Sequence, residues 1–181
     1  KIEHHYQNMY RAMYFRGSVI MSAISALEIA LWDIKGKALG VPVYELLGGK
    51  TRDRIRTYCS GLSNFDMSDD EMAKEFAVLK EKGFTASKVF IPVNNTRGDG
   101  SDELFQSKVK IAADKVKKVR EAVGDNFDLI VEVHRCMSTP EAVAFAQEIE
   151  KYHPMVLEDP IVPDNVDAMA YVAEKTNIPI A

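Results

Sequence analysis

The chain has 181 residues, of which 46% are hydrophobic and 28% are charged, a composition that excludes a disordered or collagen-like chain. Its 23 Lys and Arg residues are outnumbered by 27 Asp and Glu residues, and the net charge of −4 predicts no nucleic-acid partner. No apolar run reaches about 18 residues, so we expect no membrane-spanning helix. The only two cysteines, Cys59 and Cys136, are too few for a disulfide framework and favour a reducing, cytoplasmic location.

The first fifty residues carry helical patterns. Between Ile20 and Leu39, apolar residues recur at spacings of three and four, which is typical of an amphipathic helix. Gly40 and Pro42 follow as a helix end. Residues 1–15 predict a second helix, so the chain begins with a small helical part.

The pattern changes after Arg52. Short apolar runs at 55–60, 87–91, 129–133, 155–157 and 178–181 alternate with helical stretches, which predicts parallel βαβ units. Periodicity alone does not distinguish a doubly wound sheet from a (β/α)8 barrel. A fifth strand with no helix after it would leave one sheet face uncovered. We therefore expect the chain to be part of a longer protein, unless the remainder is disordered or has been removed.

Three side chains at predicted strand ends could carry chemistry. Glu132 and His134 are two residues apart at the end of the third run, so they point to the same side, and Glu158 ends the fourth run. The carboxyl ends of parallel strands form the ligand site of such folds. Two carboxylates there suit Mg²⁺, and a histidine can move a proton near neutral pH. The alternative is that these are solvated loop residues.

Several motifs resemble one family. Residues 22–37 (SAISALEIALWDIKGK) and 40–49 (GVPVYELLGG) look like the signature of the mandelate racemase/muconate lactonizing enzyme branch of the enolase superfamily. The stretches GFTASK at 83–88, VEVHR at 131–135 and LEDPI at 157–161 follow in the order of that family, and look most like its galactonate- and mannonate-type sugar-acid dehydratases. The resemblance implies that residues 1–52 are the helical part of an α+β capping domain. It implies that residues 53–181 are the first four βα units of a (β/α)8 barrel.

The resemblance also implies a metal site. Family members bind Mg²⁺ through acidic residues that end the third, fourth and fifth strands, and Glu132 and Glu158 match the first two. Glu132 stands where the family usually has Asp, so its role is open. The third ligand would lie past Ala181. In this family, the metal stabilises the enediolate that forms when a proton next to a carboxylate is removed.

The remaining roles follow from the same resemblance. Phe90 stands where racemases of the family have a lysine base, which favours the dehydratase group. His134 matches the general acid of that group, and the base would come from a later strand. Lys88 is expected to orient the substrate carboxylate, and Arg135 to contact a sugar hydroxyl. The alternatives are a structural lysine and a charged loop residue.

The sequence thus predicts a Mg²⁺-dependent enzyme that converts an acid sugar, a small-molecule aldonate, to a 2-keto-3-deoxy acid. We expect the full-length protein to be a homo-oligomer, as family members often are. The 181-residue chain by itself is expected to be inactive, because the third ligand and the base would lie outside it. Two alternatives stay open. One is an inert chain or homologue that keeps only the scaffold, and the other is an epimerase or cycloisomerase of the same superfamily.

Overall fold

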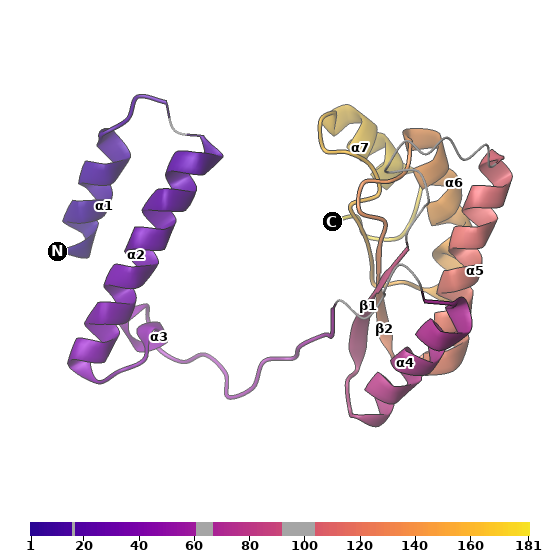
Figure 1. Cartoon of the computed structure of the whole chain (residues 1–181), viewed down its shortest axis with the longest axis horizontal. Coiled ribbons are helices and arrows are strands. Elements are labelled where there is room, and N and C mark those ends of the chain that lie inside the picture. Colours follow the sequence, from indigo (N-terminus) through magenta and orange to yellow (C-terminus); the bar gives the residue numbers. More distant parts are fainter. Residues whose placement is uncertain (16, 61–66, 92–103) are drawn as a thin grey trace. The chain divides into compact units, whose positions relative to one another are not determined.

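The computed structural model describes residues 1–15, 17–60, 67–91 and 104–181, and these fall into two units, Lys1–Ile55 and Arg56–Ala181 (Figure 1). The first unit contains α1 (Ile2–Arg11), α2 (Ser18–Leu39) and the short α3 (Val43–Leu46). Helix α1 packs on α2 and ends at Arg11, four residues earlier than the sequence pattern predicts. The predicted end of α2 is confirmed, because Gly40 adopts the left-handed conformation, with φ of 69°, that glycine accepts readily.

The turn after α2 folds back tightly on the helix at Gly36. The backbone N–H of Val41 donates to the Gly36 carbonyl at 3.0 Å. A Cβ atom on residue 36 would lie only 2.8 Å from the carbonyl oxygen of Val41. The close approach of the two backbone segments therefore requires glycine at this position of the helix.

The first unit buries little apolar surface. Among its described residues only Ile24 and Gly36 are buried. Leu27 and Ile34, which the sequence places on the apolar face of α2, are 56% and 62% exposed. The helix was predicted correctly, but burial of its apolar face is not seen within this unit.

A parallel sheet of three strands forms the centre of the second unit. The strands are β1 (Ala86–Phe90), β2 (Asp128–Glu132) and β3 (Val156–Glu158), and they lie in the order β1-β2-β3. The first and fifth predicted strands are reduced to isolated bridges, Cys59 with Ser87 and Leu157 with Ile180. The predicted first strand at 55–60 and the predicted beginning of a fifth at 178–181 are therefore present only as single bridges among the described residues, and both segments lie in parallel register beside the sheet.

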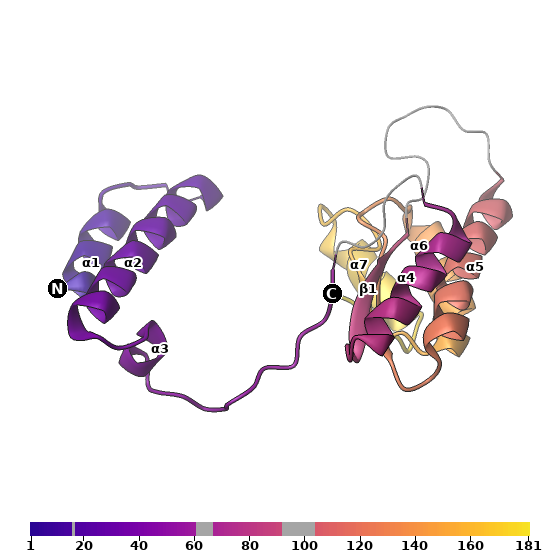
Figure 2. The same cartoon turned by 60° about the horizontal axis from the view of Figure 1, so that its bottom comes forward.

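The described residues of the second unit form four main helices, α4 (Asp69–Glu81), α5 (Phe105–Val123), α6 (Thr139–Ile149) and α7 (Val166–Glu174), with a 3₁₀ turn, η1 (Glu150–Tyr152), after α6. Helix α4 packs on α5, α5 on α6 and α6 on α7, and Figures 1 and 2 show α4, α5 and α6 on the same side of the strands. Sequential strand order with helices on one face is the arrangement of a βα barrel rather than of a doubly wound sheet.

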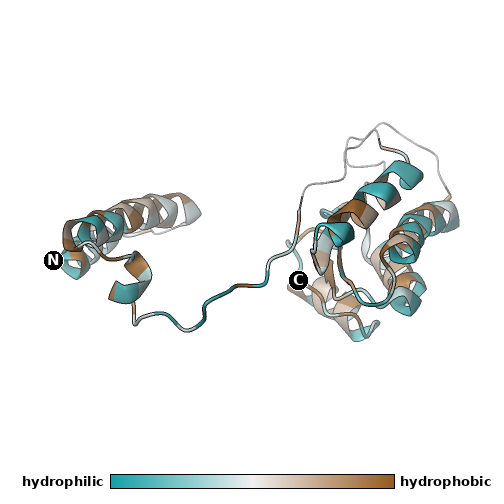
Figure 3. Ribbon diagram, turned by 90° about the horizontal axis from the view of Figure 1, so that it is seen from below, coloured by the Kyte–Doolittle hydropathy of each residue, from teal (hydrophilic) through white to brown (hydrophobic). Residues whose placement is uncertain are grey.

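Local sequence explains where these helices begin. Ser68 and Glu71 form a capping box at α4, and Ser138 and Glu141 form a second one at α6. At α7 the cap is Asn165, whose side chain accepts from the N–H of Ala168 at 3.0 Å. Hydrophilic and hydrophobic residues are mixed along the helices of the chain (Figure 3). None of the helices in the described ranges is long and apolar enough to cross a membrane.

Alternating strand residues divide between the core and the site. Val89, Val131 and Leu157 are fully buried in the core formed with the helices. The residues on either side of them along the strands point to the opposite face, because side chains alternate along a strand. That face carries Lys88, Glu132 and Glu158.

Arg120 joins α5 to the segments that precede β2 and β3. Its guanidinium is buried, with 8% of the residue exposed, and it donates only to backbone carbonyls in the described contacts. The acceptors are Gly124 at 2.7 Å, Phe127 at 2.7 Å, Tyr152 at 2.9 Å and His153 at 3.3 Å. One side chain therefore fixes the entry into both strands that carry the candidate ligands.

Candidate metal and proton-transfer site

The carboxyl ends of the strands hold the predicted site residues side by side. Glu132 and Glu158 are register partners on β2 and β3. The ladder continues past the strands, because Ile91 N–H donates to the Glu132 carbonyl at 2.8 Å and Val133 N–H donates to the Glu158 carbonyl at 3.1 Å. Backbone hydrogen bonds thus fix both glutamates on neighbouring strand ends.

Lys88 lies between the two carboxylates. Its Nζ is 2.8 Å from Glu132 Oε2 and 3.1 Å from Glu158 Oε1. The side chains of Lys88 and Glu132 are each 14% exposed, and that of Glu158 is 29% exposed. Two carboxylates at adjacent positions repel each other, and the ammonium group offsets this repulsion.

The pairing outweighs the effect of burial on both partners. Partial burial lowers the pKa of Lys88, but the hydrogen bonds that it donates to Glu132 and Glu158 more than compensate, so the net pKa lies above the usual value. Partial burial raises the pKa of Glu132, but hydrogen bonds from Lys88 and His134 give a net pKa below the usual value. Both groups are therefore charged at neutral pH.

His134 bonds to Glu132 on one side and to Arg135 on the other. Its Nδ1 is 3.0 Å from Glu132 Oε1, and its Nε2 is 2.9 Å from Arg135 Nη2. An ionised carboxylate only accepts and a guanidinium only donates. The two contacts together therefore fit a neutral imidazole that carries its hydrogen on Nδ1 and accepts at Nε2. The ring edge also contacts Phe90, at 5.8 Å between ring centroids.

The backbone after β2 and β3 is unusual at the site. His134, Arg135 and Asp159 adopt φ values of 55°, 64° and 47°, a region that residues other than glycine rarely occupy. Arg135 N–H donates to the Asp159 carbonyl at 2.7 Å, which ties the two turns together. Left-handed residues of this kind concentrate at functional sites.

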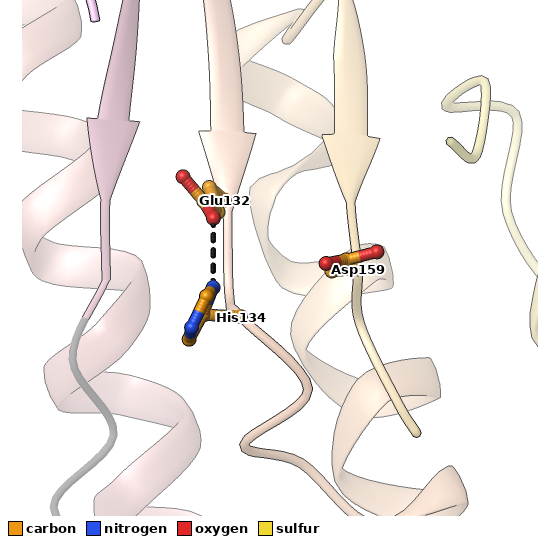
Figure 4. A group of neighbouring side chains, drawn as sticks. All are labelled: Glu132, His134 and Asp159. Atoms are coloured by element: carbon orange, nitrogen blue, oxygen red, sulfur yellow. Dashed lines mark hydrogen bonds and ion pairs between the residues drawn. The ribbon is translucent and has the colours of Figure 1, made fainter. Parts of the chain in front are cut away.

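These turns bring in Asp159, which sequence reasoning missed. Ligand atoms of Glu132, His134 and Asp159 lie within 4.8 Å of one another, and Figure 4 shows the three side chains at the ends of β2 and β3. Asp159 follows Glu158 directly, so strict strand alternation would turn it away from the site. The left-handed turn changes that direction, and the Asp-Pro pair at 159–160 was the available sequence signal for a turn.

The donor set fits a hard divalent cation. Asp159 lies with Glu132 and His134 in the group of close ligand atoms. Glu158 is the register partner of Glu132, and carboxylate oxygens are the ligands that Mg²⁺ prefers. The Lys88 ammonium beside two of them demonstrates that this position accepts positive charge.

Comparisons with known proteins agree with this fold. Residues 71–181 match the family described as enolase C-terminal domain-like. Residues 1–48 match the N-terminal domain of mandelate racemase/muconate lactonizing enzyme. The chain therefore belongs to the mandelate racemase/muconate lactonizing enzyme branch of the enolase superfamily, as its motifs predicted.

Individual relatives indicate which enzymes of this branch the chain is similar to. The chain is 37% identical over 179 residues to a D-galactonate dehydratase of Xanthomonas oryzae, an alignment that covers 97% of this chain and 44% of the relative. A solved enolase-superfamily member from Salmonella Typhimurium is 31% identical with a TM-score of 0.85, over 99% of this chain and 50% of that one. The 3,6-anhydro-D-galactonate cycloisomerase of Zobellia galactanivorans is 30% identical with a TM-score of 0.80, over 99% and 48%. The chain thus spans about half the length of these relatives.

Proposed function

We propose that the full-length protein is a Mg²⁺-dependent dehydratase that converts an aldonate to a 2-keto-3-deoxy acid. The observation that carries the proposal is the pair Glu132 and Glu158 on neighbouring strand ends, with His134 hydrogen-bonded to Glu132. The similarity to D-galactonate dehydratases supports the substrate class.

Glu132 and Glu158 are proposed to hold the metal, with Asp159 as a further oxygen donor at the same edge. When bound, Mg²⁺ would supply the positive charge that stabilises the negative charge developing on the substrate carboxylate as a neighbouring proton leaves. Glu replaces the usual Asp at residue 132, and its side chain reaches far enough to contact Lys88 and His134 at once. The longer side chain therefore brings this carboxylate into contact with both the ammonium group of Lys88 and the imidazole of His134.

His134 is proposed to protonate the departing 3-hydroxyl. For this role Nε2 must carry a proton, so Arg135 must leave that nitrogen when the substrate binds. A sugar hydroxyl that accepts from Arg135 would free Nε2 to take up a proton from water. Glu132 would stabilise this imidazolium through Nδ1 until Nε2 passes the proton to the 3-hydroxyl, which leaves as water. Lys88 is proposed to orient the substrate carboxylate. Phe90 offers no proton acceptor, so the base is assigned to none of these residues.

Two other functions have specific support. The cycloisomerase relative favours a different reaction of the same superfamily, in which the same metal site would serve another departing or attacking oxygen. The pairing of Lys88 with both Glu132 and Glu158 favours a homologue that keeps the scaffold without turnover.

The organisation of the whole protein is also a proposal. We assign residues 1–52 to the helical part of a capping domain and residues 53–181 to the first four βα units of a barrel. The two structural units and the two family matches support this division. A homo-oligomer is proposed from the family resemblance, and a cytoplasmic location from the presence of only two cysteines in the sequence.

The test is dehydration of a panel of aldonates by the full-length protein, with Mg²⁺ and with a chelator, followed by detection of the 2-keto-3-deoxy product. We expect turnover of at least one aldonate that requires the metal. The variant His134→Asn should lower turnover by about 10²–10⁴-fold. Asparagine accepts the left-handed backbone at this position, so folding should be retained.

His153→Asn is the matched control, because His153 also has a positive φ, of 49°, but lies before β3, away from the carboxyl ends of the strands. Its turnover should be unchanged. Absence of turnover for every aldonate would refute the dehydratase, and full activity of His134→Asn would remove the proposed acid.

A further inference from the structure

Lys88 uses the same carboxylate oxygens that the proposed metal needs. Its Nζ contacts Oε2 of Glu132 and Oε1 of Glu158, and all three side chains are more than two-thirds buried. Short, shielded contacts between charged groups are stronger than those at an open surface. The lysine therefore fills the position between the two acids rather than lying loosely above it.

A divalent cation that binds Glu132 must displace one of its partners. Both oxygens of this carboxylate are engaged, Oε2 by Lys88 and Oε1 by His134. Displacement of Lys88 frees an oxygen on Glu132 and one on Glu158 in a single movement, whereas displacement of His134 frees only the first. The ammonium group also sits on a flexible stem, and two cations this close would repel each other.

We infer that Lys88 and the divalent cation exchange at this carboxylate pair. Lys88 holds Glu132 and Glu158 together in the metal-free protein, and metal binding releases its ammonium group. The released lysine is then available to the carboxylate of the acid sugar. The inference rests on the metal site of the proposed function, and it adds an order of events, in which the metal binds before the substrate.

The test is Mg²⁺ binding to the full chain by calorimetry, without substrate, for the wild type and for Lys88→Met. Removal of the competing cation should tighten Mg²⁺ binding by about tenfold or more, the effect of losing one hydrogen bond between charged groups. Lys115→Met is the matched control. Lys115 pairs with Asp69 at 2.6 Å with similar burial, but between α5 and α4, so its loss should leave Mg²⁺ affinity unchanged.

A second measurement uses the unmodified protein, in case Lys88→Met does not fold. Limited acetylation followed by peptide mass spectrometry should show that Mg²⁺ increases modification of Lys88 and leaves that of Lys115 unchanged. Mg²⁺ affinity that is unchanged or weaker in Lys88→Met would overturn the inference, as would acetylation of Lys88 that does not respond to Mg²⁺. If the metal displaces His134 instead, His134→Asn rather than Lys88→Met will bind Mg²⁺ more tightly.

These outcomes are separate from those of the dehydratase assay. If Lys88→Met binds Mg²⁺ more tightly but the unmodified full-length protein turns over no aldonate, the proposed function is refuted and the exchange stands. Metal-dependent turnover with no change of affinity in Lys88→Met would refute only the exchange.

Discussion

Replacement of Arg120 by methionine should destabilise the second unit more than the loss of any surface ion pair. The guanidinium makes four hydrogen bonds to the carbonyls of Gly124, Phe127, Tyr152 and His153. Each hydrogen bond contributes about 0.5–1.5 kcal/mol net, and a charged donor lies at the upper end of this range. Relief of the buried charge offsets part of the loss. We expect the free energy of unfolding to fall by about 2–4 kcal/mol.

The assay is urea unfolding, monitored by circular dichroism. Hydrogen exchange of the backbone amides of β2 and β3 reports on the second unit in particular. Arg120→Lys keeps the charge but not the planar fork of donors, so it should give an intermediate loss. Arg56→Met is the control, because Arg56 is exposed, and its pair with Asp128 at 2.7 Å and its hydrogen bonds to Thr85 at 2.8 and 3.0 Å all lie at the surface. Its loss should change stability by less than about 1 kcal/mol. Equal effects of Arg120→Met and Arg56→Met would refute the reasoning.

Three further predictions concern local structure. Ser138→Ala removes the cap of α6 and should cost about 1 kcal/mol in urea unfolding. Partial burial raises the pKa of Glu141, but hydrogen bonds from Ser138 lower the pKa by more than burial raises it, so the net pKa lies below 4.5. The stability that Glu141 contributes is therefore present above pH 4.5 and is lost as the pH falls through the lowered value. The gap in stability between wild type and Glu141→Gln should narrow from pH 6 to pH 3, and a constant gap would contradict this sign. Gly36→Ala places a Cβ atom against the Val41 carbonyl, so limited proteolysis near residue 41 should accelerate, and an unchanged cleavage rate would argue against the close approach.

Local signals in the sequence were sufficient for much of the fold. The capping box at Ser68 and Glu71 and the glycine after Leu39 act within one helical turn, so they could be read directly. Strand alternation correctly placed Glu132 and His134 on one side, and their side chains are in contact. What these signals share is that the deciding contacts lie within a few residues along the chain.

The rest depends on contacts between distant residues. The two edge segments carry apolar runs, but a run becomes a strand only when a neighbour pairs along its length, and Cys59 and Ile180 make single bridges in the described chain. Asp159 reaches the site through a left-handed turn that no periodicity encodes. The position of Lys88 between two acids requires three strands in register, so the sequence could name the residue but not its partners.

The sequential strand order has a consequence for how the chain folds during its synthesis on the ribosome. Each strand pairs with the strand made just before it, so β2 and β3 can join the growing sheet as they emerge. Lys88 precedes both glutamates in the sequence. When the two acids meet during synthesis, the positive charge that pairs with both of them is therefore already part of the chain.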